Sequence, residues 1–290
     1  MADAATGKLG AAVERLPGAE EIYGRAPGEN FSVASIVLGR DNRRHLTAIY
    51  GYARLVDQLG DAVEGDRLAA LDAFEADLSR IFEDDMPLHP VLRRLAPTVR
   101  ELDLPRDPFD RLIEANRRDQ EVPVYETFDE LVAYCDLSAN PVGELVLHVF
   151  RAATPDRIAL SDKVCTALQL AEHWQDVAED RAAGRIYLPA EDLERFGVAP
   201  ADLDVGNAGP KLRELMTFEV ARARALLDEG APLVGRLGGR ARIAVAGYVG
   251  GGRAALDAIG AAGHDVLAGA PKAGRARRAR STLLTYARKG

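Results

Sequence analysis

Two segments of the sequence each carry a pair of aspartates spaced four residues apart. The first pair is Asp57 and Asp61, and the second is Asp176 and Asp180. Residues four apart lie on the same face of a helix, so each pair would stack two carboxylates one turn from each other. Carboxylate oxygens suit Mg²⁺, which commonly takes one or two of them together with waters and substrate phosphates. Two facing pairs would therefore make a Mg²⁺ site that a diphosphate closes.

The first pair lies in a segment that is apolar around most of the helix circumference. At about 100° per residue, a single stripe roughly 60° wide holds its polar members, which are Tyr50, Arg54, Asp57 and Asp61. Apart from Gln58, the other side chains of residues 48–63 are apolar. A helix of this kind is normally buried, so we expect the stripe to face a polar cavity or a partner helix.

The second pair repeats this pattern over residues 164–180. One face carries Gln169, Glu172, His173, Asp176 and Asp180, and the opposite face is apolar. Taken alone, one such pair would be an ordinary solvated or ion-paired helix face. The recurrence of the pattern on two apolar helices favours a shared site instead.

The residues that follow the second pair read Gly-Arg-Ile-Tyr-Leu-Pro, from 184 to 189. We expect the glycine to end the helix and to leave Arg185 and Tyr187 beside the carboxylates. A guanidinium group matches phosphate oxygens with two parallel hydrogen bonds. The alternative is an arginine that caps the negative end of the helix.

Helical spacing dominates the whole chain, and no hairpin signal separates alternating runs. The predicted helices cover residues 35–62, 68–83, 89–102, 108–118, 127–150, 156–183, 210–230 and 240–263, with a further helix in the tail. Residues 186–207 are expected to form a loop. No repeat and no flexible linker divides the sequence, so we predict one all-α domain over residues 1–290, with a basic tail at 271–290.

Composition excludes several classes of protein. The 290 residues are 47% apolar and carry a formal charge of −8, which argues against disorder and against a nucleic-acid partner. Cys135 and Cys165 form neither a disulfide framework nor a metal-binding pair. Residues 250–255 fit a dinucleotide-binding pattern, but no strand precedes them. Since no secretory signal or apolar span is visible, we expect a cytoplasmic protein.

The tail has the opposite charge from the rest of the chain. Its seven cations, with no acid among them, are Lys272, Arg275, Arg277, Arg278, Arg280, Arg288 and Lys289. Such a cluster is predicted to attract an anionic membrane surface peripherally, at about 1 kcal/mol per charge. A solvated terminus is the alternative.

The acidic pairs and the segment after them resemble the squalene/phytoene synthase family. The resemblance runs from about residue 29 to 203 and more weakly to 262, and it rests on residues 57–61, 175–180 and 184–189. It is most similar to the hydroxysqualene synthase branch of bacterial hopanoid pathways, through residues 29–35, 134–135, 138–143 and 174–177.

The resemblance implies an isoprenoid-synthase helical bundle around a central cavity. By it, Asp57, Asp61, Asp176 and Asp180 bind Mg²⁺, while Arg54, Arg185 and Tyr187 contact the diphosphate of a prenyl substrate. Phe31, Tyr50 and Val142 line the cavity, and Gln169 joins the substrate-binding residues. In this branch, presqualene diphosphate ionises and water captures the rearranged cation, which gives hydroxysqualene and pyrophosphate. Aromatic faces such as that of Tyr50 stabilise a cation of this kind.

Three residues depart from the family pattern. Gln58 stands where many relatives have a further aspartate, and Glu172 replaces an expected amide. Asp136 occupies a position where squalene and dehydrosqualene synthases usually have a tyrosine, which favours the hydroxysqualene branch.

Two other functions stay open. One is the head-to-head condensation of farnesyl diphosphate or a longer prenyl diphosphate to presqualene diphosphate, squalene or phytoene. The other is a non-catalytic role in assembly, which the retention of all four aspartates disfavours.

Overall fold

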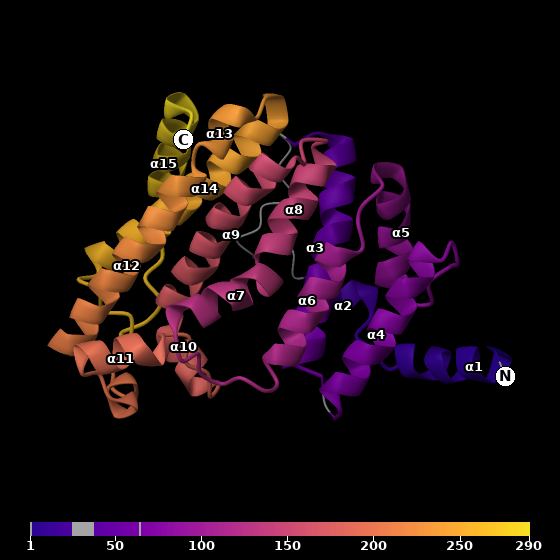
Figure 1. Cartoon of the computed structure of the whole chain (residues 1–290), viewed down its shortest axis with the longest axis horizontal. Helices are drawn as coiled ribbons and strands as arrows, with labels where there is room; N and C mark the ends of the chain where they lie inside the picture. Colours follow the sequence, from indigo (N-terminus) through magenta and orange to yellow (C-terminus); the bar gives the residue numbers. More distant parts are fainter. Residues whose placement is uncertain (1, 25–37, 64) are drawn as a thin grey trace. The chain divides into compact units, whose positions relative to one another are not determined.

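The computed structural model describes residues 2–24, 38–63 and 65–290, and over these ranges the fold is all-α (Figure 1). The extended pairing described there is a single bridge between Val124 and Ile186. The predicted fold class is thus confirmed. Contacts within the chain define two compact units, Met1–Glu121 with Glu144–Arg151, and Val122–Gly143 with Ala152–Gly290. The single domain expected from the sequence stays a prediction.

The first unit is built around α3. Its helices are α1 (Ala2–Val13), α2 (Ala19–Gly24), α3 (Arg40–Asp61), α4 (Arg67–Phe82), α5 (Pro90–Leu102) and α6 (Asp107–Arg118). Helices α2, α4, α5 and α6 pack against α3, and α1 packs against α4. The Tyr52 ring lies 5.5 Å from that of Phe74 and 5.0 Å from that of Phe109, and its hydroxyl donates to the Phe109 carbonyl. This aromatic core joins α3 to α4 and α6.

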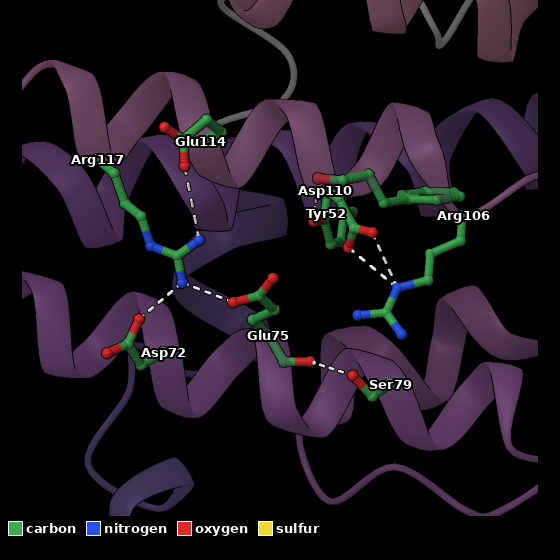
Figure 2. A network of polar contacts seen from close by, with 9 residues as sticks. Tyr52, Asp72, Glu75, Ser79, Arg106, Asp110, Glu114 and Arg117 are labelled. Atoms are coloured by element: carbon green, nitrogen blue, oxygen red, sulfur yellow. Dashed lines mark hydrogen bonds and ion pairs between the residues drawn. The ribbon is translucent and has the colours of Figure 1, made fainter.

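A polar bridge between α4 and α6 covers one side of that core (Figure 2). The Arg117 guanidinium lies 2.6 Å from a carboxylate oxygen of Asp72 and 2.6 Å from one of Glu75. At the other end of α6, Arg106, which directly precedes the helix, pairs with Asp110 at 2.9 Å. Helix α6 is therefore held to α4 by charge as well as by the apolar core.

The second unit holds α7 (Phe128–Ser138), α9 (Pro155–Gln175), α10 (Val177–Ala182), α11 (Ala190–Phe196), the 3₁₀ turn η3 (Pro200–Leu203), α12 (Pro210–Gly230), α13 (Leu233–Arg236), α14 (Gly239–Ala261) and α15 (Arg275–Arg288). Helix α8 (Asn140–Val149) contributes residues to both units. Helix α9 packs against α7, α12 and α14, and α15 runs along α14 (Figure 1). At Gly230 an added Cβ would come within 2.7 Å of the Leu160 carbonyl, so a glycine is needed where α12 meets α9.

The structure corrects several predicted element boundaries. Residues 127–150 form two helices that break at Ala139, and residues 156–183 form two that break at Asp176. The expected loop over 186–207 contains α11 and η3, and α1 and α2 were not predicted. The predicted helix at 210–230 and the tail helix are confirmed. In the described part of the chain, no helix combines the length and apolar character needed to span a bilayer.

Candidate active site

The two aspartate pairs belong to different units. Asp57 and Asp61 lie in the first unit, together with Tyr50 and Arg54, whereas Asp176 and Asp180 lie in the second. The other predicted site residues of the second unit are Val142, Gln169, Arg185 and Tyr187. Phe31 lies outside the described residues. The convergence of the two pairs on one site stays a prediction.

In the first unit, the acidic stripe follows the length of α3. Tyr50 is buried, and Asp57 and Asp61 reach solvent at the end of the helix. Although Asp57 is exposed as a residue, the protein around its carboxyl group displaces much of the water from it. This desolvation, together with the charge of Asp61, raises the pKa of Asp57 to about 7. A hydrogen bond from Asn116 and the charge of Arg54 act in the opposite direction.

Asn116 of α6 is a site residue that the sequence did not single out. Its buried side chain hydrogen-bonds Asp57 and also donates to the Leu112 carbonyl at 3.2 Å. It approaches α3 where Gly60 leaves room, since a Cβ there would lie 2.2 Å from the Asn116 Oδ1 atom. The signal available in the sequence was an asparagine inside a helical pattern, because asparagine is a poor helix former that needs local hydrogen-bond partners.

Gln58 does not belong to the acidic stripe. Its side chain is buried and its amide donates to the carboxylate of Glu21 on α2. The residue that departs from the family pattern thus holds α2 against α3.

In the second unit, Asp176 sits at the junction between α9 and α10. The Asp180 N–H still donates to the Asp176 carbonyl at 2.8 Å, so the two aspartates remain one turn apart. Partial burial raises the pKa of Asp176, and the charges of Glu179 and Asp180 raise it further, while Lys272 and His173 oppose them. The pair therefore concentrates negative charge at a position partly removed from water.

The segment before α15 runs beside this junction. The side-chain amide of Gln175, the residue before Asp176, donates to the carbonyl of Pro271. This contact joins residues 96 positions apart in the chain and places Lys272 near the acidic pair.

His173 connects the predicted site residues of the second unit. The Gln169 amide nitrogen lies 3.1 Å from His173 Nε2, and His173 Nδ1 lies 3.7 Å from an Asp180 oxygen. An amide N–H can only donate, so the Gln169 contact suits the tautomer in which Nε2 accepts and Nδ1 carries the ring proton on the side of Asp180. The ring also stacks on Tyr187 with centroids 3.7 Å apart. Gln169, Asp180 and Tyr187 are thus held around one imidazole.

A small pocket, open in part to solvent, occupies this region. Its lining consists of His173, Val177, Asp180, Arg185, Ile186, Tyr187, Leu188 and Leu203. Arg185 and Tyr187 therefore share a pocket with Asp180, and their binding of a diphosphate stays a prediction. The imidazole and the phenol present polar edges there, and Arg185 supplies a cation suited to phosphate oxygens.

Two tyrosines extend the aromatic wall behind Tyr187. Tyr125 and Tyr134 lie 5.3 Å apart, and their rings lie 6.1 and 6.0 Å from that of Tyr187. The position of Tyr125 is set by backbone pairing, since the Ile186 N–H donates to the Pro123 carbonyl and the Ala190 N–H to the Tyr125 carbonyl. The sequence did not predict this contact, because a single bridge gives no periodic pattern.

The remaining predicted residues lie apart from the pocket lining. Glu172 is exposed on α9, and Val142 is half-buried on α8 without lining the pocket. Asp136 is exposed and accepts a hydrogen bond from Asn140 at 2.5 Å. Its carboxylate therefore supports the junction between α7 and α8.

The donor chemistry of both acidic pairs suits a hard divalent cation. Each pair offers carboxylate oxygens at a position partly removed from water, and each contains a carboxyl whose pKa is raised mainly by desolvation and further by a neighbouring carboxylate. A bound cation would relieve that repulsion. Among the described residues, no three His, Cys, Asp or Glu side chains come together in an arrangement that could hold a metal ion.

Comparison with known proteins places this arrangement in a family. The squalene/phytoene synthase family profile matches residues 25–284. The chain is 35% identical to a hydroxysqualene synthase of Zymomonas mobilis over 70% of its length and 69% of the relative. It is 32% identical to the chloroplastic phytoene synthase of Daucus carota over 90% of its length and 67% of the relative.

Solved structures give the same result. The squalene synthase HpnC of Alicyclobacillus acidocaldarius is similar with a TM-score of 0.79 and 43% identity, over 87% of this chain and 98% of that one. A dehydrosqualene synthase in complex with a ligand shares the fold, with a TM-score of 0.83, 24% identity, and coverage of 93% and 95%. The chain belongs to the squalene/phytoene synthase family.

Proposed function

We propose that this protein is a hydroxysqualene synthase that converts presqualene diphosphate and water to hydroxysqualene and pyrophosphate, with Mg²⁺ as its cofactor. The observation that carries the proposal is the pocket in which Asp180, Arg185 and Tyr187 meet. It combines a carboxylate for a hard cation, a guanidinium for a diphosphate and an aromatic wall for the carbocation. Family members act on prenyl diphosphates, which is the substrate chemistry that such a pocket suits.

The departure of the diphosphate is the step that the charged residues assist. Mg²⁺, held by Asp57, Asp61, Asp176 and Asp180, would neutralise the charge that develops on the leaving group. Arg54 and Arg185 bind the diphosphate oxygens, so that the leaving group is oriented before its C–O bond breaks. His173 turns Nδ1 toward Asp180 at 3.7 Å and so helps to set the direction of that carboxylate.

The cation left behind needs a wall that neither reacts with it nor admits bulk water. Tyr187, Tyr134 and Tyr125 present ring faces and edges in the second unit, and Tyr50 is buried on the stripe of α3. Aromatic faces stabilise a cation electrostatically. Their packing also keeps bulk water away, so that a single water molecule reacts with the carbocation. The captured water loses one proton and leaves the hydroxyl of the product.

The choice of branch rests on one position and on two relatives. Asp136 replaces the tyrosine that squalene and dehydrosqualene synthases usually have there, and hydroxysqualene synthases of Zymomonas mobilis and Rhodopseudomonas palustris are 35% and 34% identical to the chain. The phytoene synthase of Daucus carota covers more of the chain at 32% identity. Condensation of two prenyl diphosphates is therefore the second candidate.

The test is a product assay with purified full-length protein and Mg²⁺. Three substrates are offered separately: presqualene, farnesyl and geranylgeranyl diphosphate. We expect presqualene diphosphate alone to be consumed and to give hydroxysqualene, with one ¹⁸O atom when the reaction is run in H₂¹⁸O. Mass spectrometry of the extracted product reports both results.

Two variants show whether the acidic pocket performs the reaction. Asp180→Asn removes a charge from the pocket and is expected to lower kcat at least about a hundredfold while the helical circular dichroism is unchanged. Glu214→Gln removes a charge from the exposed side of α12 and serves as the control. Consumption of farnesyl or geranylgeranyl diphosphate without presqualene diphosphate would favour the condensation, and full activity of Asp180→Asn would disprove the proposed site.

A further inference from the structure

The C-terminal helix presents a surface that the proposed reaction does not use. Residues 266–290 contain seven cations and no acid, so the remaining 265 residues carry a formal charge of −15. The structure places most of these cations on α15, which is exposed along most of its length. This concentration of one charge on one helix requires an explanation, because the chain as a whole is acidic.

Helix α15 is docked on α14 along one side only. Thr285 is buried and accepts a hydrogen bond from Arg253 at 3.1 Å, and the Tyr286 carbonyl accepts one from Arg242 at 2.7 Å. Gly250 of α14 permits this contact, since a Cβ there would lie 2.5 Å from the Thr282 Cα atom. The opposite side of α15 is therefore held in a fixed orientation toward solvent.

The outward side combines apolar and basic side chains. Leu283 is 68% exposed and Leu284 is 41% exposed, and the exposed alanines 276, 279 and 287 lie on the same side. Arg280 and Arg277 lie about 60° and 120° to one side of Leu283 around the helix axis, and Arg275 lies about 80° to the other side. An exposed leucine bordered by arginines is typical of helices that lie in the interface of a membrane.

The arginines of α15 differ from those of the helices beneath it. On α12 and α14, Arg213, Arg224 and Arg253 pair with aspartates at 2.5–2.7 Å. Within the described ranges, no ion pair is found for Arg275, Arg277, Arg278, Arg280 or Arg288 of α15. Their charge is thus available to an anionic partner.

We propose that the outward face of α15 binds the surface of an anionic lipid bilayer, with Leu283 inserted and the flanking arginines on lipid phosphates. Nucleic acid would use the arginines alone, and would leave Leu283 and Leu284 in water. A bilayer interface satisfies both kinds of side chain, because acyl chains accept the leucines while headgroups pair with the guanidinium groups. The inference does not depend on which prenyl diphosphate the protein converts.

Vesicle flotation with the full chain tests this inference. The probes are vesicles of phosphatidylcholine alone and vesicles with 30% phosphatidylglycerol, at 50 and 300 mM salt. We expect binding to the anionic vesicles at low salt, and loss of most of it at high salt. Arg277→Gln/Arg280→Gln is expected to lower the partition coefficient about tenfold, and Leu283→Ser about fivefold.

Matched controls come from the first unit. Arg15→Gln/Arg100→Gln removes two exposed charges, and Met86→Ser removes a side chain that is 58% exposed. Both are expected to bind anionic vesicles like the parent protein. Absence of vesicle binding by the parent protein, or equal losses in α15 and control variants, would overturn the proposal. A loss of oligonucleotide binding in the α15 variants with vesicle binding unchanged would also overturn it, in favour of a nucleic-acid surface.

Discussion

The imidazole of His173 stacks on the phenol ring of Tyr187, with ring centroids 3.7 Å apart and planes inclined by 18°. The same imidazole lies between Gln169 and Asp180. One buried ring therefore sets the orientation of a carboxylate, an amide and a phenol that were each predicted from the sequence as site residues. The sequence placed His173 on the acidic face but gave no reason to expect that it orients other site residues instead of only forming part of the wall.

His173→Ala is expected to lower kcat of the proposed reaction about tenfold to a hundredfold, the range typical of residues that orient a ligand carboxylate. His173→Phe keeps an aromatic ring to stack on Tyr187 and removes the ring nitrogen that faces Asp180. If orientation of Asp180 is the main role, both variants lose activity, whereas only His173→Ala changes the near-ultraviolet circular dichroism of the tyrosines. Glu214→Gln is the control, and unchanged kcat in His173→Phe would contradict the role of the ring nitrogen.

Gly60→Ala tests the support that α6 gives to Asp57. The new methyl group would lie 2.2 Å from the Asn116 Oδ1 atom, so Asn116 must move and its hydrogen bond to Asp57 is lost. We expect the free energy of unfolding to fall by about 1–3 kcal/mol and kcat to fall with it. Urea unfolding and the product assay measure the two effects.

Gly247→Ala is the matched substitution for that experiment, because it also places a methyl group in a helix but meets no atom within 4 Å. It is expected to leave stability unchanged or to raise it by up to about 1 kcal/mol. Equal effects of the two substitutions would show that the close approach of Asn116 does not matter.

Glu219 of α12 makes stability depend on pH. Burial is the main cause that raises its pKa to about 8, and the nearby carboxylate of Asp192 raises it further, while Arg222 opposes both. Below about pH 4.5 the carboxyl is protonated in both the folded and the unfolded state, so its ionisation does not change the free energy of unfolding. Between about pH 4.5 and 8 only the unfolded state ionises, so the free energy of unfolding falls as the pH rises and then levels off.

Glu219→Gln is therefore expected to raise the free energy of unfolding on the order of 2 kcal/mol at pH 8 and to change it little at pH 4.5. Urea unfolding at both pH values checks this, with the exposed Glu214→Gln on the same helix as control. An advantage of the same size at both pH values would assign the effect to packing and not to ionisation.

Arg117→Met tests the polar bridge between α4 and α6 (Figure 2). Arg117 is 24% exposed and contacts Asp72 and Glu75 together, so its loss leaves two carboxylates without their cation. We expect the free energy of unfolding to fall by about 1–2 kcal/mol. Arg224→Met breaks a more exposed pair with Asp257 and is expected to cost below about 0.5 kcal/mol. A larger loss in Arg224→Met would contradict this ranking.

Sequence patterns predicted most helices because their apolar faces and end signals agree. The helix at 210–230 was predicted with the observed ends, since Pro210 fits a first turn and Gly230 is followed by a turn. Two breaks were missed for different reasons. Pro141 is the second residue of α8, and since proline favours the first turn of a helix it could have revealed the break at Ala139. At Asp176 no glycine or proline interrupts the pattern, so the break could not be seen.

Helix α11 shows what a closer interpretation of end signals would have found. Pro189 precedes it and Gly197 follows it with a φ of 63°, which is the usual arrangement at the two ends of a helix. In the candidate site, the acidic pairs and the Gly-Arg-Ile-Tyr segment could be predicted because they are local in sequence. Asn116, Tyr125 and the role of His173 depend on contacts between distant segments, which no single-sequence spacing encodes.

The hydrogen bond between Gln175 and Pro271 determines how the C-terminal region should be dissected. Removing every residue after Pro271 would take away α15. It would also loosen the segment before α15, which Gln175 holds beside the junction between α9 and α10. A truncated protein would then lose turnover for reasons unrelated to membrane binding. Single replacements on the outward side of α15 separate membrane binding from catalysis, because they leave the contact between Gln175 and Pro271 intact.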